Sequence, residues 1–319
     1  MSGSLMIEAI VLWDDPNTRS HWNSHLDPEW KTFAAMVKAA SESIRTSNPD
    51  LPVVLGGVSS CDCEFLRRMR ANGVLDHVDA VGVHGFPLDW DHWQIDEWPD
   101  RIAEAREAAG KPVWVLKAGA SSFGSEEVQA FGLLKTLDLL HSAADRTYWY
   151  SLFDLPTSGT VEALHNELEE SASCRRRFLG LLKCDGTPKL AADLFPTNGS
   201  VGLCQWFRFE DPRLYDAANW MHKHGVRSLR TGLNWADWFR PNGAAWFDRM
   251  IDVLHSFDVT LTLSCTPAHL GLDAHHHSPP LDVRQFAEFA AWVVDRYARY
   301  APKSASSKVR QLRRRPIPA

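Results

Sequence analysis

Short apolar runs alternate along the chain with segments of helical periodicity. The apolar runs are rich in β-branched or aromatic residues and end near a polar residue, a glycine or a proline, which is typical of buried strands. Eight runs have this character, and they occupy residues 7–13, 51–57, 78–86, 111–119, 146–154, 200–207, 226–235 and 257–267. Amphipathic segments predict helices over residues 29–46, 63–73, 97–110, 125–143, 211–225, 243–257 and 283–300. Strands that alternate with helices pair in parallel, so the pattern predicts an α/β fold, a single closed (β/α)8 TIM barrel.

Two stretches depart from this alternation. Residues 156–200 are the least regular part of the chain. They could link two domains, but the three strands that follow cannot form a barrel alone, so we expect an elaborated eighth helical region inside one domain. Residues 303–319 are basic and contain proline, which predicts a disordered tail, with a tether to an anionic partner as the alternative. The predicted barrel domain therefore spans residues 1–302.

Composition and charge argue against several classes of protein. The 319 residues are 45% hydrophobic and 23% charged, which is ordinary globular usage. The net charge of −6 gives no reason to expect nucleic acid as a partner. No apolar run reaches the roughly 18 residues of a membrane span, and the first residues lack the basic start of a secretion signal. We expect a cytoplasmic protein, and the sequence indicates no oligomeric state.

The cysteines and histidines predict no metal or cofactor site. Cys61 and Cys63 form a C-x-C pair, which lacks the C-x-x-C spacing of a zinc site. Three consecutive histidines at 275–277 follow the last predicted strand, but three adjacent side chains do not converge on one ion without a special turn. Reduced cysteines fit the expected cytoplasmic location.

Tryptophan is unusually frequent. The chain has 14 Trp beside 5 Tyr and 15 Phe. Large core side chains account for part of this number. A flat indole also suits the apolar face of a sugar ring, and several Trp directly follow predicted strands, where loops carry function. Both uses stay open at this point.

Residues that can carry chemistry gather at the predicted strand ends. In a barrel of parallel strands, the active site lies at the C-terminal ends of the strands. The relevant segments are WDDPN at 13–17, HGF at 84–86, LKAG at 116–119, WYSLFD at 149–154, RTGLNW at 230–235 and CTP at 265–267. The first segment places the carboxylates of Asp14 and Asp15 beside Trp13, with Trp22 a few residues further on.

These segments resemble the clan A (β/α)8 glycoside hydrolases, and the β-xylosidase-like members in particular. In that clan, a W-N-E-P-N segment ends the fourth strand with the acid/base Glu, and a W-x-x-E-x-G segment ends the seventh with the nucleophile Glu. LWDDPN resembles the first motif, with Asp14 in place of Asn and Asp15 in place of Glu. KPVWVLKAGAS resembles the second, with Lys117 in place of Glu. GLLKCDGTPKLAADLF at 180–195 resembles the ending of many such barrels.

The resemblance implies a set of site residues. Asp15 and Lys117 take the two catalytic positions. His84 matches a polar residue after the sixth strand, Trp149 an aromatic floor after the eighth, and Arg230 a basic residue after the second. The full set assigned to substrate binding is Trp13, Asp14, Asn17, Trp22, His84, Trp90, Trp149, Arg230 and Trp235. The implied partner is a β-linked carbohydrate.

The matching segments occur in an altered order. The fourth-strand motif lies at residue 13, and the segments that resemble the first three strands follow residue 200. The order in the numbering of the clan is 4-5-6-7-8-1-2-3, which predicts a circularly permuted barrel. Permutation is tolerated where the original termini lie close together on the surface. The helix at 283–300 would then pack beside the strand at 7–13 and close the ring.

The substitutions alter the chemistry that the two motifs carry. A retaining glycosidase needs two carboxyl groups about 5–5.5 Å apart. Asp15 can still donate a proton, although its side chain is one methylene shorter than that of Glu. Lys117 cannot form a glycosyl ester, and its charge repels an oxocarbenium-like transition state. Asp14 can only accept a hydrogen bond where the amide of Asn would donate to a sugar 2-hydroxyl.

Three hypotheses follow. The first is a glycoside-hydrolase-like protein whose degenerate site is weak or inactive and still binds sugar. The second is an active β-glycosidase with a substitute carboxylate. The candidates for that carboxylate are Asp89, Asp91, Asp154 and Asp237. The third is Schiff-base chemistry at Lys117, with non-catalytic carbohydrate binding as a further alternative. A lysine becomes nucleophilic in an apolar pocket, but strand alternation predicts that Leu116 and Ala118 face away from Lys117 and do not form one.

A structural alternative competes with all three hypotheses. Lys117 could simply form an ion pair with Asp14 or Asp15 in a site that has lost its catalytic function. The Trp-rich stretch at 87–98 has a comparable alternative, because it could form either the wall of a sugar subsite or an ordinary packed loop.

Overall fold

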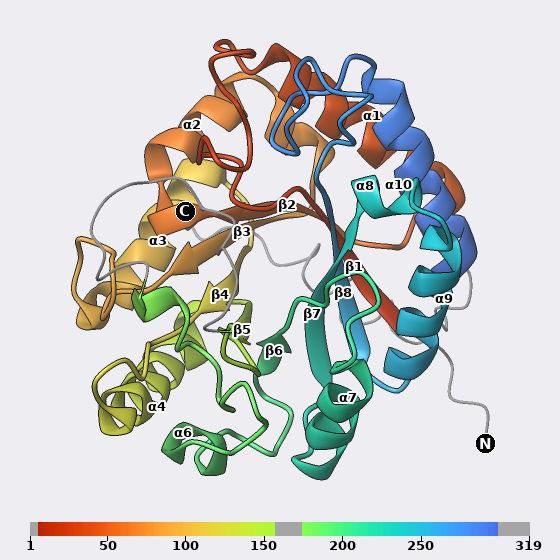
Figure 1. The fold of residues 1–319 in the computed structure, drawn as a ribbon. Helices are drawn as coiled ribbons and strands as arrows, with labels where there is room; N and C mark the ends of the chain where they lie inside the picture. Colours follow the sequence, from red (N-terminus) through yellow and green to blue (C-terminus); the bar gives the residue numbers. More distant parts are fainter. Residues whose placement is uncertain (1–5, 157–173, 299–319) are drawn as a thin grey trace.

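The computed structural model describes residues 6–156 and 174–298. Eight parallel strands form one closed barrel in chain order, and β1 pairs with β8 to complete it (Figure 1). The strands are β1 (Met6–Leu12), β2 (Val53–Val58), β3 (Ala80–Gly85), β4 (Val113–Ala118), β5 (Arg146–Tyr150), β6 (Gly202–Cys204), β7 (Ser228–Asn234) and β8 (Asp258–Ser264). The predicted TIM barrel is confirmed. The expectations for the tail at 303–319 and for the middle of the irregular segment lie outside the described residues.

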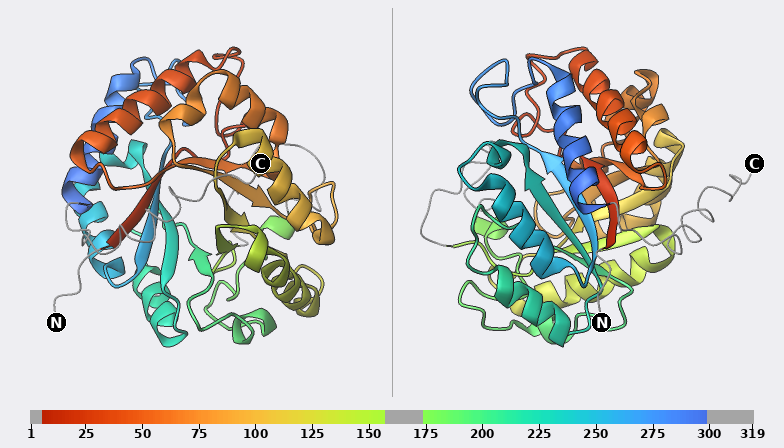
Figure 2. Two further views of the ribbon diagram at one scale, coloured as in Figure 1. Left: turned by 180° about the vertical axis from the view of Figure 1, so that it is seen from behind. Right: turned by 90° about the vertical axis from the view of Figure 1, so that its right-hand side faces the viewer.

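Helices surround the barrel, as the two views in Figure 2 show. The α-helices are α1 (Lys31–Ser47), α2 (Cys63–Ala71), α3 (Trp98–Ala109), α4 (Glu126–Ala143), α6 (Leu190–Asp193), α7 (Leu214–Lys223), α8 (Trp235–Trp238), α9 (Gly243–Leu254) and α10 (Val283–Tyr297). Short 3-10 helices are η1 (Ser59–Cys61), η2 (Val74–His77) and η3 (Ile95–Glu97). Helix α10 packs against α1 near the junction of β1 and β8 (Figure 1). No helix in the described part of the chain is long and apolar enough to cross a membrane.

Local sequence signals fix several helix ends. The Asp62 carboxylate accepts a hydrogen bond from the Phe65 amide at the start of α2, and the Ser125 hydroxyl accepts one from the Val128 amide at the start of α4. Such side chains satisfy amide groups that the first helical turn leaves unpaired. Gly110 ends α3 with a φ of 65°, a left-handed conformation that glycine adopts without strain.

Buried side chains form two separate clusters. The cluster inside the barrel consists of Ala9, Val11, Val54, Ala80, Trp114, Leu116, Tyr148 and Cys204. A larger cluster fills the space between the strands and the helices. The alternation of strand side chains between the two faces accounts for this division. Because side chains fill the interior, a ligand can approach only the open ends of the barrel.

An extra residue in β4 changes which side chains face the barrel axis. The register pairs Val83 with Val115 and then His84 with Lys117, so Leu116 has no partner on β3. This irregularity is a bulge. Leu116 packs in the interior cluster, and the Lys117 side chain also turns toward the axis, where it meets the end of β1. The expectation that Leu116 and Lys117 face opposite ways is therefore wrong.

Candidate functional site

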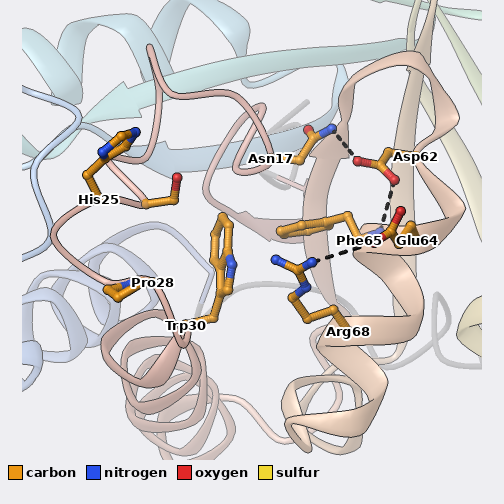
Figure 3. Close-up of a pocket in the computed structure, with 9 residues that line it drawn as sticks. Asn17, His25, Pro28, Trp30, Asp62, Glu64, Phe65 and Arg68 are labelled. Atoms are coloured by element: carbon orange, nitrogen blue, oxygen red, sulfur yellow. Dashed lines mark hydrogen bonds and ion pairs between the residues drawn. The ribbon is translucent and has the colours of Figure 1, made fainter.

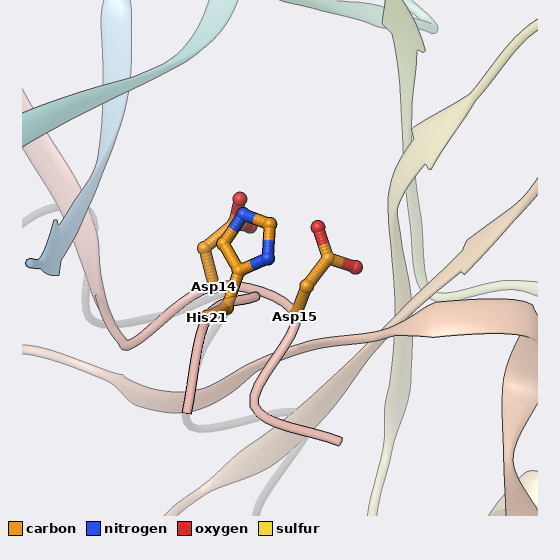
Figure 4. A group of neighbouring side chains, drawn as sticks. All are labelled: Asp14, Asp15 and His21. Atoms are coloured by element: carbon orange, nitrogen blue, oxygen red, sulfur yellow. The ribbon is translucent and has the colours of Figure 1, made fainter. Parts of the chain in front are cut away.

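The end of β1 turns two carboxylates toward the barrel axis. Trp13 has a φ of 72° and Asp15 a φ of 45°, values that non-glycine residues rarely adopt and that cluster at functional sites. The Asp15 amide donates to the Gly57 carbonyl at 3.0 Å, which fixes this turn. Both carboxylates, of Asp14 and Asp15, therefore lie on the same side, with the imidazole of His21 beside them (Figure 4).

Lys117 lies between these two carboxylates. Its Nζ donates to Asp14 Oδ2 at 2.7 Å and to Asp15 Oδ2 at 3.1 Å. The rings of Tyr150 and Trp206 flank the ammonium group, and each ring centre lies 5.7 Å from Nζ, within the range of a cation–π interaction. The arrangement is the ion pair of the structural alternative, and it includes both aspartates at once.

Arg230 supplies a second buried cation. Its Nη2 donates to Asp14 Oδ1 at 2.5 Å, its Nε to Thr262 Oγ1 at 3.1 Å, and its Nη1 to the Leu116 carbonyl at 3.3 Å. Each oxygen of the Asp14 carboxylate therefore binds one cation. Arg230 has no exposed surface, which corrects its predicted role: it holds Asp14 in place and does not touch a ligand.

His84 links Asp15 to Arg230. Its Nδ1 lies 2.7 Å from Asp15 Oδ1, and its Nε2 lies 3.4 Å from Arg230 Nη1. Because a guanidinium only donates, Nε2 accepts, and the proton on Nδ1 is donated to Asp15. Gly57 leaves room for the ring, since a Cβ at this residue would lie 1.7 Å from His84 Nε2. The imidazole is therefore a fixed link within the cluster of charges.

Burial and ion pairing act in opposite directions on these groups. Burial opposes ionisation of Asp14, but Lys117 and Arg230 outweigh it and lower the pKa to about 2. Burial also disfavours the charge on Asp15, yet His84 and Lys117 hold its pKa well below the ordinary value. Burial disfavours charged Lys117 too, but Asp14 and Asp15 raise its pKa. Burial lowers the pKa of His84 to about 4. At neutral pH, two carboxylates thus balance two cations around a neutral imidazole.

A small pocket opens beside this cluster. Its volume is about 140 Å³, close to the roughly 150 Å³ cavity that holds one benzene ring. The residues that line it include Asp15, His84 and Lys117 from the cluster, and His21, Trp90, Tyr150 and Arg176 around them. Aromatic, hydroxyl and charged groups together suit a polar ring. Asp15 supplies the one carboxylate among the described residues that line this pocket.

Four of the predicted sugar-binding tryptophans are core residues. Trp22, Trp149 and Trp235 have no exposed surface, and Trp13 has 1%. Trp13 packs edge-on against Trp22 at a centroid distance of 5.1 Å, and both Trp13 and Trp235 contact Phe286 of α10. The predicted substrate contacts of these four residues are therefore corrected, because no face of their rings is open to a ligand.

Tyr150 takes the place that the sequence analysis gave to Trp149. Along β5, Tyr148 belongs to the interior cluster and Tyr150 packs against that cluster. Trp149 lies between them and faces the outer cluster. Tyr150 therefore faces the barrel mouth, where it lines the pocket. The strand has aromatic residues on both faces, so alternation alone did not reveal which ring points inward.

Asn17 lies outside the pocket, at a groove beside α2. Its Nδ2 donates to the Ser59 carbonyl at 3.2 Å and to Asp62 Oδ2 at 3.3 Å, and its Oδ1 accepts from the Ser59 amide at 2.9 Å. Figure 3 shows the Asn17 amide directed at Asp62 across this groove, whose lining includes Trp30 and Phe65. These hydrogen bonds tie the loop after β1 to the turn after β2, and the predicted substrate contact of Asn17 stays a prediction.

The four candidates for a substitute carboxylate have partners elsewhere. Asp154 pairs with Lys189 at 2.6 Å and Asp237 with Arg240 at 2.8 Å. The partners of the other two are the Arg175 guanidinium and the Ser121 amide for Asp89, and the Ser60 hydroxyl and the Phe86 amide for Asp91. The described lining of the pocket includes none of the four.

One group of described residues has ligand atoms placed closely enough to surround a metal ion. Its members are Asp14, Asp15 and His21, whose ligand atoms lie within 4.8 Å of one another. Both carboxylates already bind Lys117. A metal ion would have to displace that ammonium group, so the group does not fit a metal centre. The rings of His275 and His277 stack with centroids 5.1 Å apart, and the histidine run contributes to no such group in the described part of the chain.

Four residues of the site were not predicted from the sequence, namely Tyr150, Trp206, Arg176 and Gly57. Trp206 lies two residues after the end of β6, and this position near a strand end was a usable signal. Gly57 belongs to a glycine pair at the end of β2, where the register with β3 shifts, and a glycine at such a point indicates a bulge or a close approach. Arg176 comes from a run of arginines far from any strand end, so no local pattern indicated it.

No protein-family model matches the sequence, and no curated protein matches it. Among solved structures, the chain is similar to a Bacteroides uniformis β-glucuronidase at 13% identity and a TM-score of 0.41, over 67% of this chain and 24% of that one. It is similar to a dihydrodipicolinate synthase from Bacillus clausii at 11% identity and a TM-score of 0.44, over 96% and 78%. A GH99 endo-α-mannosidase from Bacteroides thetaiotaomicron has 12% identity and a TM-score of 0.34, over 76% and 81%.

The chain spans about a quarter of the length of that β-glucuronidase. The three neighbours are named for different activities, and similarity at this level carries no argument about function. The assignment of the barrel rests on the pairing of its own eight strands.

Proposed function

We propose that the pocket at the mouth of the barrel binds a carbohydrate, in a glycoside-hydrolase-like site without retaining hydrolysis. The proposal draws on the WDDPN and VWVLKAG segments, which resemble the catalytic motifs of the clan A hydrolases and which border the pocket. The pocket has about the volume of one ring. The proposed ligand is a β-linked glycoside bound through a single sugar unit.

The position of Lys117 carries the proposal. In the retaining mechanism, a carboxylate attacks the sugar while a second, protonated carboxyl group about 5–5.5 Å away assists the leaving group. Lys117 stands where the motif has the nucleophile, and its Nζ binds both aspartates. The pKa of Asp15 is held well below its ordinary value by His84 and Lys117, against burial, so Asp15 lacks the proton that a general acid needs at neutral pH.

The two catalytic alternatives find less support. An active hydrolase needs a second carboxylate, and Asp15 is the single one in the described lining of the pocket. Schiff-base chemistry needs a neutral amine, and hence a lowered pKa. Although burial favours neutral Lys117, Asp14 and Asp15 raise its pKa. A charged ammonium group bound by two carboxylates is a poor nucleophile.

Circular permutation remains part of the proposal. The order of the motif-like segments supports it, and the closed ring, in which β1 pairs with β8, allows the chain to begin at any strand. A variant with new termini between β5 and β6 tests this point. These termini restore the strand order of the clan. If the chain is a permuted member of that order, the variant should fold and keep its near-ultraviolet circular dichroism spectrum. An unfolded product would argue against it.

Calorimetric titration with methyl β-D-xyloside and methyl β-D-glucoside tests the proposed function, and aryl glycosides of the same sugars report hydrolysis. We expect saturable binding without release of the aryl group. Ser20→Trp fills the pocket, because Ser20 lines it, and should abolish binding. Ser256→Trp places the same ring on the exposed surface after α9 and should not. Aryl release by the unaltered protein would contradict the proposal, and so would a failure to bind any sugar tested, neutral or anionic.

A further inference from the structure

Arg176 brings a further cation to the pocket. Its guanidinium carbon lies 5.1 Å from the centre of the Trp90 ring, and its side chain lines the pocket. No hydrogen bond or ion pair among the described residues includes this guanidinium. The neighbouring Arg175, in contrast, pairs with Asp89 at 3.3 Å. The Arg176 donors are therefore available to a ligand.

The remaining charges at the pocket cancel one another. Asp14 binds both Lys117 and Arg230, and Asp15 binds Lys117 as well. Burial lowers the pKa of His21 below its ordinary value, so the imidazole that also lines the pocket is neutral near pH 7. Arg176 thus adds a positive charge that no described carboxylate at the pocket balances, and this charge favours an anionic ligand.

The contact between Arg176 and Trp90 prepares the guanidinium for such a ligand. A cation–π contact with a ring occupies none of the N–H groups of the guanidinium as hydrogen-bond donors. These donors match a carboxylate or a phosphate group through two parallel hydrogen bonds. Trp90 is itself held by the ring of Phe86, with centroids 4.4 Å apart. The aromatic pair therefore restricts the positions that the guanidinium can take before a ligand arrives.

We infer that the sugar bound in this pocket carries an anionic group, the carboxylate of a uronic acid or a phosphate ester, which pairs with Arg176. The inference rests on the proposed carbohydrate function. A volume of about 140 Å³ restricts the enclosed part of the ligand to one ring. The anion and the ring that Tyr150 and Trp90 border therefore belong to the same sugar unit.

Two glycosides that differ in one group test this inference. Methyl β-D-glucuronide has a carboxylate where methyl β-D-glucoside has a hydroxymethyl group, and glucose 6-phosphate compared with glucose tests the phosphate. By calorimetry, the unaltered protein should bind at least one of the two anionic sugars about tenfold more tightly than its neutral counterpart, which equals about 1.4 kcal/mol. Sodium chloride should reduce this preference, because salt screens the ion pair.

Two matched variants locate the effect. Arg176→Gln removes the charge at the pocket and should remove the preference for the anionic sugar. Arg67→Gln makes the same change on the exposed face of α2, outside the pocket, and should keep it. Equal melting temperatures of the two variants would exclude unfolding as the cause.

The outcomes separate this inference from the proposed function. Equal affinities for the neutral and both anionic sugars would overturn the inference and leave sugar binding in place. A preference that survives Arg176→Gln would also overturn it. If none of the sugars bound, the proposed function itself would fail, and the inference with it.

Discussion

Lys117 donates a hydrogen bond from Nζ to Asp14 Oδ2 at 2.7 Å, and this contact joins the ends of β4 and β1. The same ammonium group binds Asp15, and Arg230 binds the other oxygen of Asp14. Removal of one member from such a buried set leaves another charge uncompensated. The Lys117–Asp14 pair therefore determines both the stability of the barrel mouth and the chemistry that it can support.

Lys117→Met should destabilise the protein strongly. The substitution keeps most of the volume of the side chain but leaves Asp14 and Asp15 with one cation fewer, and a broken buried pair typically costs about 3–5 kcal/mol. Urea unfolding measures the change. Lys38→Met on the exposed face of α1 is the control and should stay within about 0.5 kcal/mol of the unaltered protein. Equal stability of the two variants would show that the ion pair contributes nothing.

Stability should fall as the pH drops from about 6.5 to about 4. Burial lowers the pKa of His84 from 6.5 to about 4, so in this window the unfolded chain binds a proton that the folded chain does not. The His84 contribution amounts to about 3 kcal/mol at most. Urea midpoints across this range should show a shallower slope for His84→Asn than for His25→Asn, a change at an exposed histidine. Identical slopes would contradict a buried, neutral His84.

Gly57→Ala should disturb the site through His84. A Cβ at residue 57 would lie 1.7 Å from His84 Nε2, which forces the imidazole away from Asp15. We expect a destabilisation of about 1–3 kcal/mol, the usual cost of overpacking. Because His84→Ala removes the obstructed ring, the double variant should be more stable than the sum of the single effects predicts. Strict additivity in urea unfolding would show that the two residues do not clash.

Lys117 should resist amine-reactive labels. Asp14 and Asp15 raise its pKa although burial opposes this, and the residue is 8% exposed. A timed reaction at pH 7.5, followed by peptide mass spectrometry, should label the exposed Lys38 at least about tenfold faster than Lys117, because only the neutral amine reacts. Early labelling of Lys117 would reopen the Schiff-base hypothesis.

The sequence predicts the barrel well because most of its strands lie in runs of β-branched or aromatic residues that are closed by a turn signal. The rule that strand ends meet at one mouth also selected Asp15, His84 and Lys117, which do lie in contact. Neither result depends on the exact register. The eight strands and the meeting of their C-terminal ends follow from the repeated alternation of strand and helix.

Side-chain direction was harder to predict, since one bulge reverses it. The extra residue in β4 turns Leu116 and Lys117 the same way, and β5 has aromatic residues on both faces, which hid the choice between Trp149 and Tyr150. Trp13 and Trp22 looked like stacking surfaces because they follow a strand, yet helix α10 covers Trp13. Such packing depends on contacts between segments that lie far apart in the sequence. The position of Arg176 at the pocket depends on contacts of the same kind.

The most direct test of the account restores both motifs at once. In Asp14→Asn/Asp15→Glu/Lys117→Glu, one of the two new glutamates would be protonated and the other ionised, which is what retaining chemistry requires. The ionised glutamate would balance the charge of Arg230. We predict that the unaltered protein releases no aryl group from aryl β-xyloside, β-glucoside or β-glucuronide, and that the triple variant hydrolyses at least one of them. Asp14→Asn/Asp15→Glu, which keeps Lys117, should remain inactive. Hydrolysis by the unaltered protein would contradict the claim that Lys117 disables this site.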